Sequence, residues 1–428
     1  MMNQENDTSP EKQEARSDAT EETAYSAPVN GGLQAWLQVA GPFFLFFNSW
    51  GTVNTFGVFQ TYYEIELLKD QSSSNISWIG AIQAFMLLVV GVITGPFYDS
   101  GYFYVLAATG AILIVVGFMA LSMCAEYWQV LLAQALCVGV GSGCLYIPSV
   151  AIISQYFSSR RAIATAVAAS GSSFGGVLYP IVFRQLQPHI GFGWATRALG
   201  FLVLATTSFS LSVMRVRQVP KQMRFLTEFS AFKEVPYALF CMAMFFGYIG
   251  FFNPIFYIEA YAIQKHAMGE ALAFYLVSIL NAASVPGRIV PGLLGLRFGP
   301  LSILLGSAII SGILSLCWIA ISNAGGLIAL AVLYGFFSGA FVSLPAVALT
   351  ALTPNLQTLG TRMGMCSLLC GFGSLCGAPV AGAILDDTRS YLGVQLYSGL
   401  TIGTTGFLLL CASLLRKRTD YGPTRPCA

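Results

Sequence analysis

Residues 76–98 read ISWIGAIQAFMLLVVGVITGPFY, a run that contains no charged side chain. A helix needs about 20 mainly apolar residues to cross the hydrocarbon core of a bilayer, so this run is long enough to span a membrane. Similar runs recur along the chain and bring the expected number of spanning helices to twelve, near 35–60, 76–98, 102–123, 128–153, 162–184, 194–214, 236–260, 271–294, 300–321, 326–350, 360–385 and 393–415.

The composition of the whole chain agrees with a protein surrounded by lipid. Its 428 residues are 56% hydrophobic and only 9% charged, whereas soluble domains carry roughly 25% charged residues. The net charge of +2 gives no electrostatic argument for a nucleic-acid partner. The lipid bilayer and a small molecule are the expected partners.

The apolar runs fall into two groups of six, separated by a polar stretch with five basic residues. The predicted fold is an all-α membrane protein with twelve transmembrane helices in two pseudo-symmetric six-helix halves. The expected divisions are a disordered cytosolic tail (1–29), an N-terminal half (30–214), a cytosolic linker (215–235), a C-terminal half (236–416) and a second cytosolic tail (417–428).

An internal repeat supports two related halves. The segment 146–151 (YIPSVA) recurs as 343–348 (SLPAVA), and the same offset places Val58-Phe59 on Ile255-Phe256. A shared offset in separate regions indicates duplication, which is common among transporters.

Basic residues in loops predict the orientation, because cytosolic loops carry an excess of Lys and Arg. With the N-terminus inside, the cytosolic side receives most of the basic residues, and both termini are cytosolic. The plasma membrane is the default location, with the vacuolar membrane as the alternative. The outer side receives only Lys69, Arg184, Arg197, Lys265 and Arg389.

Small residues at helical spacing mark faces where membrane helices approach closely. Such pairs occur on four of the predicted helices, and either static packing or surfaces that rock against one another would explain them. The pairs are Gly91/Gly95, Gly171/Gly175, Gly287/Gly292 and Gly373/Gly377.

A charge inside the bilayer is costly, which makes Arg288 within 271–294 the leading functional candidate. Arginine can hold a carboxylate through two parallel hydrogen bonds, and binding of an anionic substrate is one interpretation. A structural arginine tied to backbone carbonyls is the other. Uncharged candidates for substrate contact, each equally compatible with helix packing, are Asn54, Gln83, Tyr146, Asn253, Tyr257, Asn281 and Ser284.

Arg160 and Arg161 precede the fifth predicted helix, where they either anchor the helix at the cytosolic face or form an inner gate. The two histidines and the cysteine spacings suggest no metal site or cofactor. Motifs typical of hydrolases and metalloproteases are missing, so an enzyme is not expected.

Several motifs resemble the monocarboxylate-porter-like group of the major facilitator superfamily, in the style of its fungal members. The stretches that carry the resemblance are Asn30–Trp36, Phe56–Phe59, Gly141–Pro148 and the signature of the fifth helix, Tyr156–Ala162 followed by Ala168–Gly171. The resemblance covers residues 30 to about 418 and implies alternating access for small metabolites. The loop Gly95–Gly101 resembles a remnant of the general facilitator motif, which makes Asp99 a third gating candidate.

The resemblance also supports Arg288 as a carboxylate contact, because related porters carry an arginine there. Two departures argue against proton-coupled lactate transport of the animal type. Ser284 stands where those porters have an aspartate, and Asn54 stands where they have a lysine. The expected function is a secondary transporter of a small organic metabolite, either a carboxylate or a specialised metabolite, with a monomer as the default. The alternative is a nutrient sensor that binds ligand without net transport.

Overall fold

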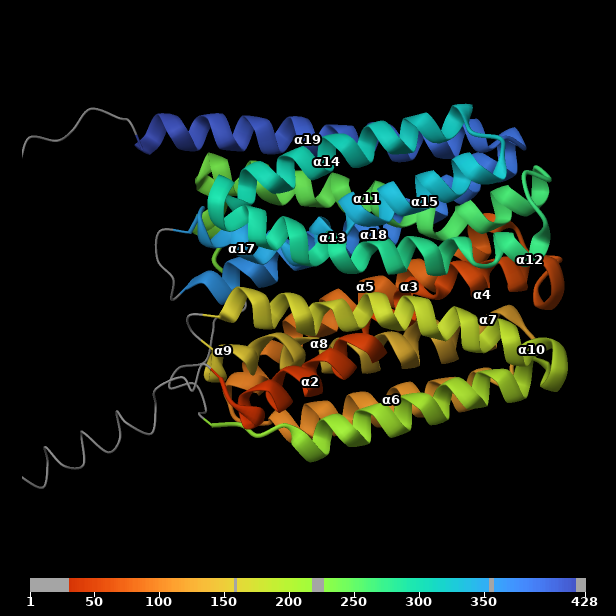
Figure 1. The fold of residues 1–428 in the computed structure, drawn as a ribbon, viewed down its shortest axis with the longest axis horizontal. Helices are drawn as coiled ribbons and strands as arrows, with labels where there is room; N and C mark the ends of the chain where they lie inside the picture. The colour runs from red at the N-terminus through yellow and green to blue at the C-terminus, as the bar shows by residue number, and fades with distance from the viewer. Residues whose placement is uncertain (1–30, 158–159, 218–226, 354–357, 421–428) are drawn as a thin grey trace, which may run out of the picture.

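The computed structural model describes residues 31–157, 160–217, 227–353 and 358–420. The predicted tail 1–29 lies outside the described residues, as do residues 218–226 of the predicted linker and 421–428 of the second tail. Within the described ranges the chain is built from helices joined by short turns (Figure 1).

The first crossing is made of consecutive pieces, α2 (Leu33–Asn48), α3 (Trp50–Asn54), α4 (Phe56–Tyr62) and the π-helical turn η1 (Tyr63–Leu67). The next crossings are α5 (Ser73–Asp99) and α6 (Phe103–Leu121). A fourth crossing contains α7 (Tyr127–Val130), the π-helix η2 (Leu131–Val138), α8 (Gly139–Ala151) and α9 (Ile153–Tyr156). The half ends with α10 (Arg161–Val213).

The second half begins with the 3₁₀ turn η3 (Phe229–Lys233) and α11 (Val235–Gln264). It continues with α12 (Glu270–Ala273), α13 (Leu276–Phe298), α14 (Pro300–Cys317) and the 3₁₀ turn η4 (Trp318–Ala320). The last crossings are α15 (Ala324–Ser338) with α16 (Ala340–Ser343) and α17 (Pro345–Thr350), then α18 (Leu359–Thr388) and α19 (Tyr391–Asp420).

Ten helical segments of the described chain are long and apolar enough to cross a membrane. One of them, Ile163–Val213, has 51 residues, which at ~1.5 Å per residue is more than twice the ~30 Å hydrocarbon thickness. Its backbone turns at Gly191, where φ is 76°, and Figure 1 shows the chain running back from that point. Two crossings in α10 and one in α2–η1 confirm the predicted twelve.

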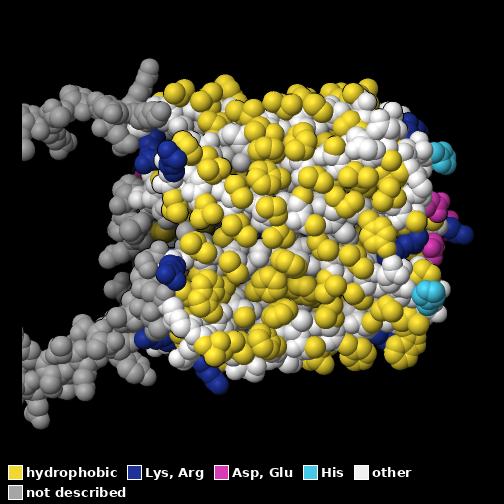
Figure 2. All heavy atoms as spheres, viewed as in Figure 1, with side chains coloured by type: hydrophobic (Ala, Val, Ile, Leu, Met, Phe, Trp, Pro, Cys, Tyr) yellow, Lys and Arg dark blue, Asp and Glu magenta, His cyan; other side chains and the backbone are white. Residues whose placement is uncertain are grey.

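The molecule has two distinct ends. Figure 1 shows that α2 begins and α19 ends on the same side, which we call the terminal end. The opposite side, where α10 turns back and α12 lies, is the far end. Figure 2 shows hydrophobic side chains over the middle of the surface, with charged side chains gathered at both ends. This distribution is that of a multi-pass membrane protein.

The two halves pack through equivalent helices. α5 lies against α18, and the first part of α10 lies against α13. At the offset of the internal repeat, α5 corresponds to α13 and this part of α10 to α18, so each contact is the symmetry mate of the other. Gly57 meets the backbone of Ile255, which lies one position from its own repeat equivalent. This contact therefore lies close to the pseudo-twofold axis.

Two of the predicted glycine pairs form packing contacts inside one half and not a surface between the halves. Gly171 and Gly175 pack on the backbone of α2, while Gly373 and Gly377 pack on that of α11, so both pairs lie inside their own half. Each close approach fixes two helices of one half rigidly together. Other glycines of the described chain face the other half, among them Gly57, Gly176, Gly364, Gly371 and Gly382.

Candidate functional site

The far end is closed by a carboxylate that bridges the two halves. Asp386 of α18 accepts hydrogen bonds from the backbone N–H groups of Ser73 (3.1 Å) and Ser74 (3.0 Å) in the first turn of α5. Free N–H groups and the helix dipole make a helix N-terminus a favourable place for a negative charge. The hydroxyl of Ser74 also donates to the carbonyl of Pro379 at 3.0 Å.

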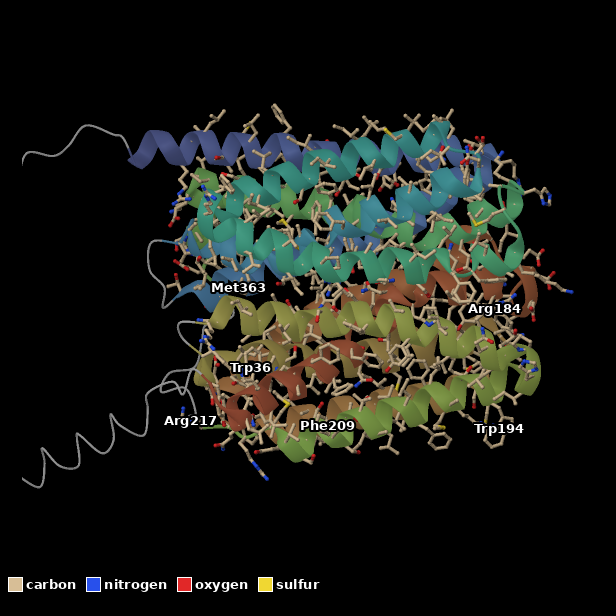
Figure 3. The ribbon with its side chains drawn as sticks, viewed as in Figure 1. Trp36, Arg184, Trp194, Phe209, Arg217 and Met363 are labelled. Atoms are coloured by element: carbon tan, nitrogen blue, oxygen red, sulfur yellow. The ribbon has the colours of Figure 1, made fainter. Side chains whose placement is uncertain are left out.

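Further contacts between the halves lie beside the Asp386 contacts. We call the whole set the far-end clamp. The Tyr257 hydroxyl on α11 donates to the carbonyl of Ala378 at 3.0 Å and also bonds Ser77 of α5. Arg184, which Figure 3 places at the far end, lies over the ring of Phe274 with 3.4 Å to the centroid. The structure therefore places Tyr257, a predicted substrate contact, in the clamp.

Arg288 occupies the middle of the interface between the halves. Its side chain is 2% exposed, and its Nη1 donates to the carbonyl of Ala169 (2.7 Å) and to the hydroxyl of Ser172, both on α10. Its Nε is buried without a hydrogen-bond partner among the described residues. In this conformation a charged side chain of the second half is thus held by the first half.

Two other predicted residues lie beside Arg288 on α13. The Ser284 hydroxyl bonds that of Ser173 on α10 at 2.6 Å. Asn281 packs against Gly176 of α10, and its amide donates to the carbonyl of Val277 at 2.9 Å. Arg288, Asn281 and Ser284 therefore share one face of α13, turned toward the fifth crossing.

Aromatic side chains and an amide from four other helices line the neighbouring region. Tyr146 of α8 packs edge to face with Trp50, with ring centroids 6.0 Å apart. Tyr248 of α11 is close enough to interact electrostatically with Arg288 and with Tyr146. The amide of Gln83 donates a long bond of 3.4 Å to Thr52, next to the first crossing.

Several polar atoms of this region are buried and have no hydrogen-bond partner among the described residues. They include the indole Nε1 of Trp50 and the amide oxygen of Gln83. Asn54 is also buried, at the end of α3. Since buried polar groups are normally hydrogen-bonded, such atoms are available for a ligand or water. Asn253 of α11 has both amide atoms in the same condition.

The three predicted gating residues lie at the terminal end. Arg160 and Arg161 are exposed at the start of α10. Asp99 is buried at the end of α5 and does have an interaction partner. No hydrogen bond or ion pair among the described residues joins Asp99 to the two arginines.

Ionisable side chains outside the centre form a separate network at the terminal end. Arg362 donates two hydrogen bonds to Glu234 (2.6 and 2.8 Å) and also pairs with Glu228. The hydrogen bonds from Arg362 lower the pKa of the Glu234 carboxyl below its ordinary value. Among the described residues no cluster of His, Cys, Asp or Glu is suited to a metal ion.

Sequence reasoning missed the partners on α10 and the acidic side chains of the far end. Ser172, Ser173 and Asp386 were not among the predicted site residues, although they contact the other half. Glu259 was not predicted as a site residue either, and it is fully buried. The one available signal was a negative charge inside an apolar run, which is costly unless it has a purpose.

Two six-helix halves, clamped at one end around a buried arginine in the middle, define a membrane transporter of the alternating-access type. The comparison with known families agrees. The Major Facilitator Superfamily matches residues 41–324 and, a second time, residues 237–426. The chain belongs to this superfamily, and the second match begins close to the start of α11.

Similar curated proteins come from fungi and carry transporter names. The chain is 46% identical to the MFS-type transporter dbaD of Emericella nidulans, over 90% of this chain and 87% of that protein. It is 37% identical to the aspyridones efflux protein apdF of the same organism, over 90% and 79%. It is 35% identical to the agnestins efflux protein AgnL12 of Paecilomyces divaricatus, over 89% and 88%. The chain is thus a secondary transporter related to fungal efflux proteins.

Proposed function

We propose that this transporter exports a specialised organic metabolite and binds an oxygen-bearing group of it at Arg288. The efflux names of the relatives apdF and AgnL12 support export. The observation that carries the site is the buried guanidinium of Arg288 between the halves, which among the described residues donates to one carbonyl and one hydroxyl. A carboxylate or enolate would be a stronger acceptor than either of these partners.

Arg288 links binding to the movement of the halves. Its bonds to Ala169 and Ser172 join α13 to α10, so separation of these helices breaks them. After the halves separate, a substrate oxygen can accept the hydrogen bonds that the Arg288 guanidinium donated to the α10 acceptors. Binding energy is then available for the state in which the middle of the interface is open, as differential affinity requires.

We place the terminal end in the cytosol. The support is the distribution of basic residues, and Figure 3 shows Arg217 at the terminal end. The domain divisions at 30–214, 215–235 and 236–416 are retained as part of this proposal. The described chain is then in a state closed toward the outside, with Arg288 at its middle.

The finer assignment is to the monocarboxylate-porter-like group. Its support is the set of motifs in the sequence and the burial of Arg288 in α13. The plasma membrane is the proposed location, which suits export to the medium, and a monomer is the proposed assembly. We propose neither an enzymatic role nor a nucleic-acid partner, and the transporter names of the relatives give no support to a sensor.

The test compares cells that carry the wild-type chain with cells that carry Arg288→Ala, by untargeted measurement of metabolites inside the cells and in the medium. Loss of a charge-assisted contact costs about 1.5–3 kcal/mol, so export should fall by about tenfold to about a hundredfold. Arg288→Lys keeps the positive charge but loses the two parallel N–H donors of the guanidinium, so its export should fall between that of the wild type and that of Arg288→Ala.

Arg297→Ala is the matched control, because Arg297 is exposed at the end of the same helix. It should export at the wild-type rate. Wild-type export by a well-folded Arg288→Ala protein would refute the assigned site. If the wild-type chain shifts no metabolite between cells and medium while it is present in the membrane, the proposed function itself fails.

A further inference from the structure

Glu259 of α11 is a buried acidic side chain that the proposed substrate site does not use. It lies near the far end of α11 and is 0% exposed. Both of its carboxyl oxygens are buried without a hydrogen-bond partner among the described residues. A buried carboxyl group in this condition is rare in proteins and marks a functional position when it lies within a membrane protein.

The surroundings of Glu259 come from the other half of the molecule. Thr61 of α4 lies beside it, but the Thr61 hydroxyl donates to the carbonyl of Gly57 at 3.1 Å. Arg184 of α10 acts on it electrostatically while its guanidinium lies over the Phe274 ring. Glu64 of η1 is a second acid nearby. Glu259 thus faces the partner half at the closed end.

A pocket at the far end lies near Glu259, although Glu259 does not line it. Its volume is about 170 Å³, which is room for several water molecules at ~30 Å³ each. Thr61 and Arg184 line it, and the same two residues flank Glu259. Water in the pocket would therefore reach two of the residues that surround Glu259.

Other charged or titratable groups around α11 are few. Asp386 of α18 and Tyr391 of α19 interact with Glu64 instead of with Glu259. Glu270 of α12 lines the pocket. Tyr334 of α15 donates to a backbone carbonyl of α11 at 2.9 Å, and Arg288 of α13 lies near Tyr248, three turns away along α11. Arg184 is the one cation among these groups that acts on Glu259 directly.

Burial decides which form of Glu259 the closed end accepts. A carboxylate without a donor loses its hydration and gains no hydrogen bond, whereas the neutral acid loses much less. The nearby acid Glu64 disfavours a second negative charge. When the halves part at this end, water reaches Glu259 and the ionised form becomes acceptable.

We propose that Glu259 is a proton-binding site of the transport cycle, neutral while the far end is closed and ionised when the far end opens. One proton from the far-side solution forms one O–H bond on the carboxylate as the end closes. The same bond breaks, and the proton returns to water, as the end opens. Acid on the far side therefore favours closure.

The first test needs no substrate. Infrared difference spectra of the full-length protein in lipid nanodiscs, recorded while the pH is changed, should contain the carbonyl band of a protonated carboxylic acid. Glu259→Gln should lose this band, and Glu259→Asp should shift it. Glu270→Gln, which changes an exposed acid lining the same pocket, should retain it. An unchanged band in a folded Glu259→Gln protein overturns the proposal.

The second test measures closure itself. Spin labels carried by unnatural amino acids at Lys69 and Lys265, exposed on opposite halves of the far end, report the distance across it. A single proton changes the closed-to-open ratio by at most about tenfold per pH unit, and the wild-type chain should close on acidification. Glu259→Gln should remain closed at every pH. A pH response equal to that of the wild type overturns the proposal.

The link from closure to export rests on the proposed function, and the two can fail separately. Export by the wild-type chain should vary with the pH of the medium, whereas export by Glu259→Gln should not. If the wild-type chain exports nothing, the proposed function fails while the infrared and distance results still decide the role of Glu259. If export by Glu259→Gln follows the pH of the medium as the wild type does, the proton site fails and the transporter remains.

Discussion

The bridge from Asp386 to the start of α5 predicts that one substitution opens the far end. Asp386→Asn keeps one carbonyl acceptor for the N–H groups of Ser73 and Ser74, but it loses the second acceptor and the negative charge. The contacts at 3.1 and 3.0 Å are of the length expected for good hydrogen bonds. The closed state should therefore lose stability relative to the open state.

The magnitude follows from these two losses. A hydrogen bond to a charged group contributes about 1.5–3 kcal/mol, and the partial exposure of Asp386 favours the lower value. The charge at a helix N-terminus adds about 0.3–1 kcal/mol. A sum of about 2 kcal/mol changes the closed-to-open ratio roughly 30-fold. An open population of about 1% would rise to about a quarter.

The assay is the distance between spin labels at Lys69 and Lys265 in nanodiscs. Asp387→Asn is the matched control, because it makes the same chemical change at the next, exposed residue. The Asp386→Asn protein should show a second, longer distance that the control lacks. Equal distance distributions in both variants, or the same opening in both, would refute the reasoning.

Two further predictions concern the axis and the terminal end. Gly57→Ala places a Cβ 2.4 Å from the carbonyl oxygen of Ile255, which should destabilise the closed state by about 1–3 kcal/mol. The distance between the same two spin labels should then show an open population. Gly292→Ala is the control, because the space around Gly292 is open, and it should leave the distance unchanged. Because Arg362 lowers the pKa of Glu234, that pair stabilises the fold above the ordinary pKa of about 4.3 and the contribution disappears as the pH falls through the lowered value. The Glu234 side chain is 39% exposed, so Glu234→Gln should lower the free energy of unfolding by about 1 kcal/mol or less at neutral pH. In thermal unfolding measured across pH, the variant should also lose this part of the fall in stability at acidic pH. A variant whose stability falls at acidic pH as much as that of the wild type would contradict the prediction.

The spans were predictable because hydrophobic length is a local property of the chain. The run 76–98 became α5 (Ser73–Asp99), with one turn or less of difference at either end. The division into halves followed from the repeat offset, and the buried charge of Arg288 followed from its place in an apolar run. None of these inferences depends on which face of a helix packs against which neighbouring helix.

The contacts between the halves could not be predicted, because they depend on the rotation of each helix and on the conformational state. Gly175 and Gly176 are adjacent in sequence, yet one packs on α3 of its own half and the other on Asn281 of the other half. The bond from Ser73 to Asp386 joins residues 313 positions apart. Such a pair has no local pattern, and it exists only while the far end is closed.

The two acids of the far end place opposite demands on the same closure. Asp386 accepts hydrogen bonds from two N–H groups across the halves as a carboxylate. Glu259 has no hydrogen-bond partner among the described residues, and it fits the closed end as a neutral acid. When both groups are deprotonated, the charge on Glu259 opposes closure. When both are protonated, Asp386 loses the negative charge that holds the clamp. Closure is therefore most stable when one carboxyl group is charged and the other is not. The difference between them lies in the donors that each one meets. The N-terminus of α5 supplies two N–H groups to Asp386, whereas the Thr61 hydroxyl beside Glu259 donates to the carbonyl of Gly57.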